Sequence, residues 1–271
     1  RQLALGAALE TGLSRWELCW AGPPVRRTAP AWFTEDLPAA LDRAVAEPAV
    51  TAPLRTLLLR GGAHLLGGWW TIRTRFPSLS QAEREAEVQR WARGFLRVWR
   101  IDLQVRGTPP AQGPLLLVAN HISWLDILVL HAAGFCRFVS KADIKDWPVI
   151  GMMATHAGTL YIARDSRRDA LRVVHHMRDA LLRGEVVAVF PEGTTSDGLT
   201  LLPFHANLIQ AAISAESPVL PVALEFIDRR SGQMSTAPMY IGDQTLIESV
   251  WRTLTTPGLR AVVSYGEPQS P

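Results

Sequence analysis

From about residue 101 onward, the chain alternates short apolar runs with longer segments of helical periodicity. Short apolar runs bounded by turn residues predict buried strands. These strands are predicted at Leu115–Ala119, Arg137–Ser140, Thr159–Ile162, Val186–Phe190, Val219–Leu224 and Leu259–Ser264. Helices are predicted between them, near 124–133, 147–156, 166–183 and 205–215. The alternation predicts an α/β domain over residues 104–271, with a central, largely parallel or mixed sheet flanked by helices.

The predicted helix at 166–183 has the clearest periodicity. Ser166 can cap its N-terminus, Asp169 occupies the capping-box position, and Gly184 follows its last turn. The side chains expected to form its buried stripe are Leu171, Val174, Met177 and Leu181.

Two helices are predicted in residues 51–103, ahead of the α/β domain. The first, within "PLRTLLLRGGAHLLGGWWTIRTRF", has an uncharged stretch only from Gly61 to Ile72. A spanning helix needs roughly 20 predominantly apolar residues. This segment is therefore expected to lie in a membrane interface, or to be re-entrant, rather than to span.

The second helix begins with the capping-box pattern of Ser80 and Glu83. Its apolar residues recur at helical spacing and are Val88, Trp91, Phe95, Val98 and Trp99. Arginines occupy much of the remaining surface, as on helices that lie on anionic lipid. The alternative is an amphipathic helix packed on its own domain, with its arginines solvated. Taking both helices together, we favour membrane association.

Composition and charge support this interpretation. The chain has 271 residues, ten of them Trp, and a formal net charge of +3. Residues 51–110 alone carry ten Arg and four acidic residues. This basic segment favours an anionic membrane surface, and no nucleic-acid-binding motif accompanies it. Cys19 and Cys136 form no metal or disulfide pattern, so no metal is predicted. Residues 1–50 are expected to form a poorly ordered extension or short helices.

Three polar clusters follow predicted strands. The first contains Asn120, His121, Ser123 and Asp126; the second is Arg164 with Asp165; the third is "PEGTTSDG" at 191–198. Functional groups gather beyond the carboxyl ends of strands in open α/β sheets. The three clusters are therefore expected to share one site.

His121 and Asp126 could form a general base and its orienting carboxylate. Five residues separate them, about 140° apart on a continuous helix, so the spacing permits the pair without requiring it. A helix cap with a backbone-bonded His is the alternative. The segment at 191–198 is hydroxyl-rich and glycine-containing, which suits anion binding. Its alternative is an ordinary strand-to-helix turn.

Together, NH-x4-D, "GTLYIAR", "FPEGTTS" and "VLPVAL" resemble the glycerolipid acyltransferase superfamily, which includes 1-acylglycerol-3-phosphate acyltransferases. The resemblance implies that His121 deprotonates a lysolipid hydroxyl and that Asp126 orients it. The acyl group would come from a thioester of acyl carrier protein or coenzyme A, without an acyl-enzyme and without a cofactor. The residues then expected to bind the acceptor are Arg164, Glu192, Gly193, Thr194 and Thr195. The cytoplasmic face of the inner membrane is the expected location.

The chain departs from the family pattern at Thr195, where an Arg is common, and at His205, near which a basic residue is common. A phosphomonoester head usually requires such cations. The expected acceptor is 1-acyl-sn-glycerol-3-phosphate, giving phosphatidic acid. The "FPEGTTSDG" form is similar to the branch that acylates lyso-ornithine lipids, which is the alternative acceptor. A non-catalytic lipid-binding protein on the same fold is an alternative of another class.

Overall fold

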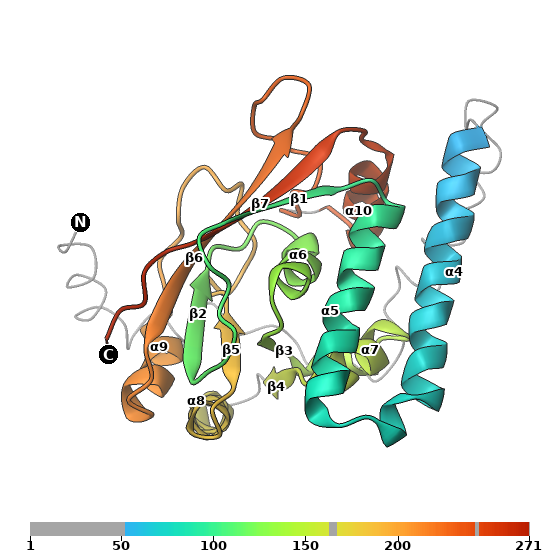
Figure 1. Cartoon of the computed structure of the whole chain (residues 1–271). Coiled ribbons are helices and arrows are strands. Elements are labelled where there is room, and N and C mark those ends of the chain that lie inside the picture. Colours follow the sequence, from blue (N-terminus) through green and yellow to red (C-terminus); the bar gives the residue numbers. More distant parts are fainter. Residues whose placement is uncertain (1–51, 163–166, 242–243, 271) are drawn as a thin grey trace.

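The computed structural model describes residues 52–162, 167–241 and 244–270 (Figure 1). The strands are β1 (Asp102–Arg106), β2 (Leu115–Ala119), β3 (Arg137–Lys141), β4 (Leu160–Ile162), β5 (Val186–Val189), β6 (Val219–Asp228) and β7 (Leu259–Tyr265). The α-helices are α4 (Ala52–Thr74), α5 (Gln81–Val98), α6 (Leu125–Ala133), α7 (Ile150–His156), α8 (Arg167–Leu182), α9 (Ala206–Ser214) and α10 (Leu246–Thr255). The short 3-10 helices are η2 (Phe76–Ser78) and η3 (Ala142–Asp146).

The strands form one seven-stranded sheet in the order β1-β7-β6-β2-β5-β3-β4. All neighbouring pairs are parallel except β6 and β7, which are antiparallel. The prediction of a mixed sheet flanked by helices is confirmed. Because β2, β5 and β3 run in the same direction, the segments that follow them leave the sheet at one edge.

One strand and one α-helix were not predicted. The strand β1 is partly exposed, with a charged residue at each end, so its pattern lacks the apolar run that marks a buried strand. It begins at Asp102, two residues before the predicted start of the α/β domain. The helix α10 has a capping box of Thr245 and Glu248, which is a signal that the sequence carried.

The prediction for the buried stripe of α8 is right for three residues and wrong for Leu171. Met177 and Leu181 are fully buried and Val174 is nearly so, whereas Leu171 is 57% exposed. Leu171 lies about 120° around the helix from Met177, outside the arc that faces the sheet. Val173 is buried in its place. Ser166, the predicted cap, lies outside the described residues.

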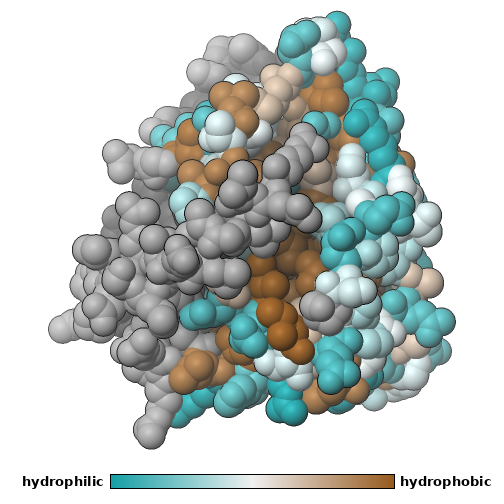
Figure 2. All heavy atoms as spheres, turned by 90° about the vertical axis from the view of Figure 1, so that its left-hand side faces the viewer, coloured by the Kyte–Doolittle hydropathy of each residue, from teal (hydrophilic) through white to brown (hydrophobic). Residues whose placement is uncertain are grey.

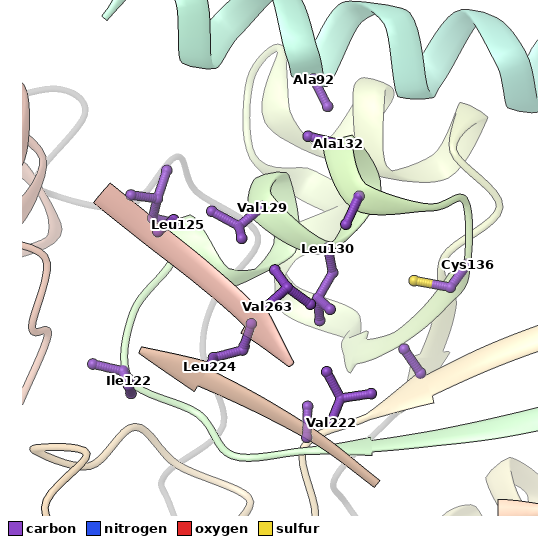
Figure 3. Close-up of a cluster of buried hydrophobic side chains, with 14 of the residues drawn as sticks. Ala92, Ile122, Leu125, Val129, Leu130, Ala132, Cys136, Val222, Leu224 and Val263 are labelled. Carbon is purple, nitrogen blue, oxygen red and sulfur yellow. The ribbon is translucent and has the colours of Figure 1, made fainter. Parts of the chain in front are cut away.

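The helix α6 is enclosed between the sheet and α5 (Figure 3). Ala132 of α6 and Ala92 of α5 are both fully buried, and their small side chains allow the two helices to approach closely. On the sheet side, Leu125 and Leu130 pack with residues of β6 and β7 (Figure 3). Because α6 is buried on nearly all sides, its packing fixes where the residues at its N-terminus lie.

The strand β2 contributes to hydrophobic cores on both faces of the sheet. Leu115, Leu117 and Ala119 pack in the cluster that contains α5 and α6. Leu116 and Val118 pack on the opposite face, against α8 and α9. All five residues are buried, as expected for a central strand covered on both faces.

The predicted pair of helices ahead of the sheet is present as α4 and α5. The capping box of Ser80 and Glu83 is formed, as predicted. The indole ring of Trp99, at the C-terminal end of α5, packs directly against the backbone of Gly61 on α4. A Cβ atom at Gly61 would lie only 2.2 Å from this ring, so the close contact depends on the absence of a side chain there. His64 of α4 stacks on Trp91 of α5, with ring centroids 5.1 Å apart.

The aromatic stripe of α5 therefore packs inside the protein, against α4 and α6, as the second interpretation of this helix proposed. The most exposed large hydrophobic side chains of α4 are Leu59, Leu66 and Trp70, which are 75%, 68% and 62% exposed. No helix in the described part of the chain is both long and apolar enough to cross a bilayer.

Candidate active site

His121 lies in the turn between β2 and α6, and its imidazole Nδ1 is 2.7 Å from Oδ2 of Asp126. Asp126 lies in the first turn of α6 and is fully buried. The same Oδ2 accepts hydrogen bonds from the backbone N–H groups of Ile122 and Ser123, at 2.7 and 2.9 Å. One carboxylate oxygen of Asp126 is thus the partner in all three of these contacts, and it holds the turn in place. With Nδ1 donating to Asp126, Nε2 of His121 remains able to accept a proton.

Asn120 ties the same turn to β6. Its side-chain amide donates to the carbonyl of Leu224 and accepts from the N–H of Leu224, at 3.0 and 2.7 Å. The amide thereby continues the backbone pairing of the sheet beyond the end of β2. Asn120 positions the turn rather than facing a substrate.

Residues of the segment after β5 form hydrogen bonds to both backbone groups of His121. Glu192 is 4% exposed, and its Oε1 accepts from the N–H of His121 at 2.8 Å. Its Oε2 accepts from the N–H of Leu202 at 2.9 Å. The N–H of Ser196 donates to the carbonyl of His121 at 2.8 Å. Glu192 therefore spans between two loops and holds the position of His121.

The next residues of this segment face a large cavity. Gly193 has a φ of +69°, in the region that favours glycine, and its N–H donates to the carbonyl of Phe190 at 3.0 Å. The hydroxyl of Thr195 donates to the carbonyl of Tyr240. Gly193, Thr194 and Thr195 all line the cavity, as does His121. Arg164, the remaining predicted binding residue, lies outside the described residues.

His205 lies against this loop. A Cβ on Gly193 would come within 2.7 Å of the imidazole Nε2 of His205, so the two residues are in close contact. Burial lowers the pKa of His205, which favours the neutral ring. His205 therefore does not supply the fixed cation that an Arg or Lys would.

The cavity has a volume of about 2260 Å³ and lies between the helices α4, α5 and α7 and the edge of the sheet. Small-molecule pockets are typically roughly 300–1,000 Å³, so this one is large enough for long apolar chains. Most of its lining side chains are apolar or aromatic. Phe190 forms part of its wall and stacks on His121, with ring centroids 4.0 Å apart.

Sequence reasoning did not identify Lys141. It is the last residue of β3, is exposed, and lines the cavity. The rule that found the other clusters also applies to it, since a charged side chain directly follows the predicted strand at 137–140. Among the described residues, no group of three or more His, Cys, Asp or Glu side chains could hold a metal ion.

Residues 100–225 match the family model described as Acyltransferase. Over 184 residues, the chain is 41% identical to the 1-acyl-sn-glycerol-3-phosphate acyltransferase of Neisseria meningitidis serogroup B, covering 67% of this chain and 71% of that one. The chain belongs to the glycerolipid acyltransferase superfamily. It is an acyltransferase, as the resemblance of its motifs implied.

Two further acyltransferases show the breadth of the similarity. The lyso-ornithine lipid O-acyltransferase of Pseudomonas aeruginosa is 36% identical over 210 residues, covering 74% of this chain and 80% of that one. The crystal structure of the 1-acyl-sn-glycerophosphate acyltransferase from Thermotoga maritima superposes with a TM-score of 0.53 at 18% identity, covering 79% of this chain and 87% of that one. The structural match confirms the fold.

Proposed function

We propose that this acyltransferase moves a fatty acyl group from a thioester to the free hydroxyl of 1-acyl-sn-glycerol-3-phosphate, giving phosphatidic acid. The observation that carries the proposal is the 2.7 Å contact of His121 Nδ1 with the buried Asp126. Nε2 of His121 takes the hydroxyl proton while the oxygen attacks the thioester carbonyl. The thiolate of acyl carrier protein or coenzyme A leaves and receives that proton.

The lining of the cavity supports a lipid acceptor with a negatively charged head. Lys141 lies at its edge, and it forms no ion pair within the described residues. Gly193, Thr194 and Thr195 lie beside His121 and are proposed to contact the head group together with Arg164. Glu192 is proposed to act through the backbone of His121, because both of its carboxylate oxygens already accept backbone hydrogen bonds.

A second acceptor, a lyso-ornithine lipid, is favoured by one specific observation. Thr195 uses its hydroxyl to hold Tyr240 and carries no charge, and the neutral form of His205 is favoured. An amino-acid head group needs fewer cations than a phosphomonoester.

Purified enzyme given both lysolipids with an acyl thioester decides between the acceptors. Faster acylation of 1-acyl-sn-glycerol-3-phosphate supports the first proposal, and faster acylation of the lyso-ornithine lipid supports the second. His121→Ala is expected to abolish both reactions while the protein stays folded. Retained transfer in that variant contradicts the mechanism. If neither lipid is acylated by the folded wild type, both acceptor assignments are wrong.

Membrane association at the cytoplasmic face of the inner membrane is proposed to depend on α4. Hydrophobic residues also reach the surface on the side of the molecule shown in Figure 2, so exposure alone does not single out this helix. On α4, however, Leu59, Leu66 and Trp70 lie near one another on one outward face, with arginines at both ends of the helix. Leu66→Glu with Trp70→Glu is expected to prevent flotation with anionic vesicles. Leu199→Glu, in the loop before α9, is the matched control.

A further inference from the structure

Three buried nitrogen atoms in the described part of the chain have no hydrogen-bond partner, and all three belong to side chains that line the large cavity. They are Trp99 Nε1, Trp124 Nε1 and His131 Nδ1. Buried polar atoms in folded proteins are nearly always paired, because an unpaired one loses its hydrogen bonds to water without replacement. The side chains that carry these atoms lie along one apolar cavity, so polar groups are concentrated on this part of its wall.

His131 is the most informative of the three. Its side chain is 5% exposed, on α6, and its ring contacts those of Phe135 and Phe138. Burial lowers the pKa of His131 to about 4, so the ring is neutral near pH 7. A neutral imidazole has one donor and one acceptor nitrogen. A hydrocarbon chain pairs with neither, whereas a hydroxyl group can pair with either.

A column of aromatic rings leads from the catalytic base to His131. His121 stacks on Phe190 at 4.0 Å, Phe190 stacks on Phe138 at 5.8 Å, and Phe138 contacts His131 edge-on at 4.9 Å. All four rings line the cavity. The two imidazoles are therefore at most about 15 Å apart, a distance that an extended chain covers in about twelve bonds at about 1.25 Å each.

We propose that the cavity binds a fatty acyl chain that carries a hydroxyl group, and that His131 forms a hydrogen bond to this hydroxyl. The inference rests on the proposed function for the entry point of the chain, because the reacting end lies at His121. Donor and acceptor chains both meet at His121. The hydroxylated chain can therefore belong to either substrate, and the test separates the two.

The test uses a series of dodecanoyl chains with one hydroxyl moved from carbon to carbon, and the plain chain as reference. One arm presents the series as acyl thioesters, and the other presents it within the lysolipid acceptor. We expect kcat/KM to peak at one hydroxyl position, about tenfold above the plain chain, in one of the arms. The His131→Phe variant should lose the peak but should still react with the plain chain. His131→Gln, which keeps a donor and an acceptor, should retain it.

His175→Phe is the matched control, because His175 is exposed on α8 and does not line the cavity. It should behave as wild type. Two results overturn the proposal: the wild type shows no peak in either arm, or a peak persists in His131→Phe. The wild-type measurement tests the first result even if His131→Phe fails to fold. Binding of the free hydroxy and plain acids, followed by Trp fluorescence, tests His131 even if no acyl transfer is found.

Discussion

Replacing Asp126 with Asn removes the negative charge beside His121 and leaves the shape of the turn nearly unchanged. One oxygen, Oδ2, accepts from His121 Nδ1 and from the N–H groups of Ile122 and Ser123. An Asn whose amide oxygen takes this position still accepts all three hydrogen bonds. The ring orientation is therefore kept, and the variant isolates the contribution of charge to stabilising the imidazolium that the proposed mechanism forms.

The magnitude follows from the geometry of this contact. Nδ1 and Oδ2 are 2.7 Å apart, and Asp126 is fully buried while His121 is 20% exposed, so water screens the pair only in part. Two unit charges with centres about 4 Å apart interact by about 4 kcal/mol at an effective dielectric constant of about 20. Since about 1.4 kcal/mol corresponds to a tenfold change in rate, kcat should fall by about a thousandfold.

The assay is acyl transfer at saturating substrate, with circular dichroism to confirm folding. Asp126→Ala should lose more activity than Asp126→Asn, and also stability, because Ile122 and Ser123 lose their acceptor. In a His121→Ala background, Asp126→Asn should have little further effect, since Asp126 acts through His121. A folded Asp126→Asn variant within tenfold of wild type refutes this account of the dyad.

Three further predictions concern stability and the loop at 191–198. The pKa of His131 is about 4 in the folded protein against 6.5 as its ordinary value, so the unfolded chain binds more protons between these values. Urea unfolding should therefore show stability falling as pH drops from 6.5 to 4, by about 3 kcal/mol, and His131→Phe should lack this component. Gly193→Ala should reduce acyl transfer more than tenfold, because its Cβ would lie within 2.8 Å of the His205 ring at a positive φ. Gly232→Ala, also at positive φ but in open space, should leave the transfer rate unchanged. Ser80→Ala should lower the free energy of unfolding by about 1 kcal/mol through loss of the capping box on α5, and an unchanged urea midpoint would count against that role.

The sequence alone was enough to predict most of the sheet and the pairing of His121 with Asp126. Buried strands such as β2 are marked by apolar runs, because both of their faces lie in a core. His121 and Asp126 could be named because they follow such a run in the NH-x4-D pattern, within one turn of the chain. Local contacts of this kind depend on few residues, so a short pattern can specify them.

The remaining features depend on contacts between distant parts of the chain. Glu192 lies 71 residues from His121, and only the packing of β5 beside β2 shows that its carboxylate holds the backbone of that residue. The aromatic stripe of α5 looked like a lipid-facing surface, but α4 and α6 cover it, because amphipathicity shows that a face is buried and not what buries it. His131 was an isolated histidine in the sequence. The sheet and helices place it at the wall of the cavity, because burial and the lack of a partner arise only when the surrounding elements assemble.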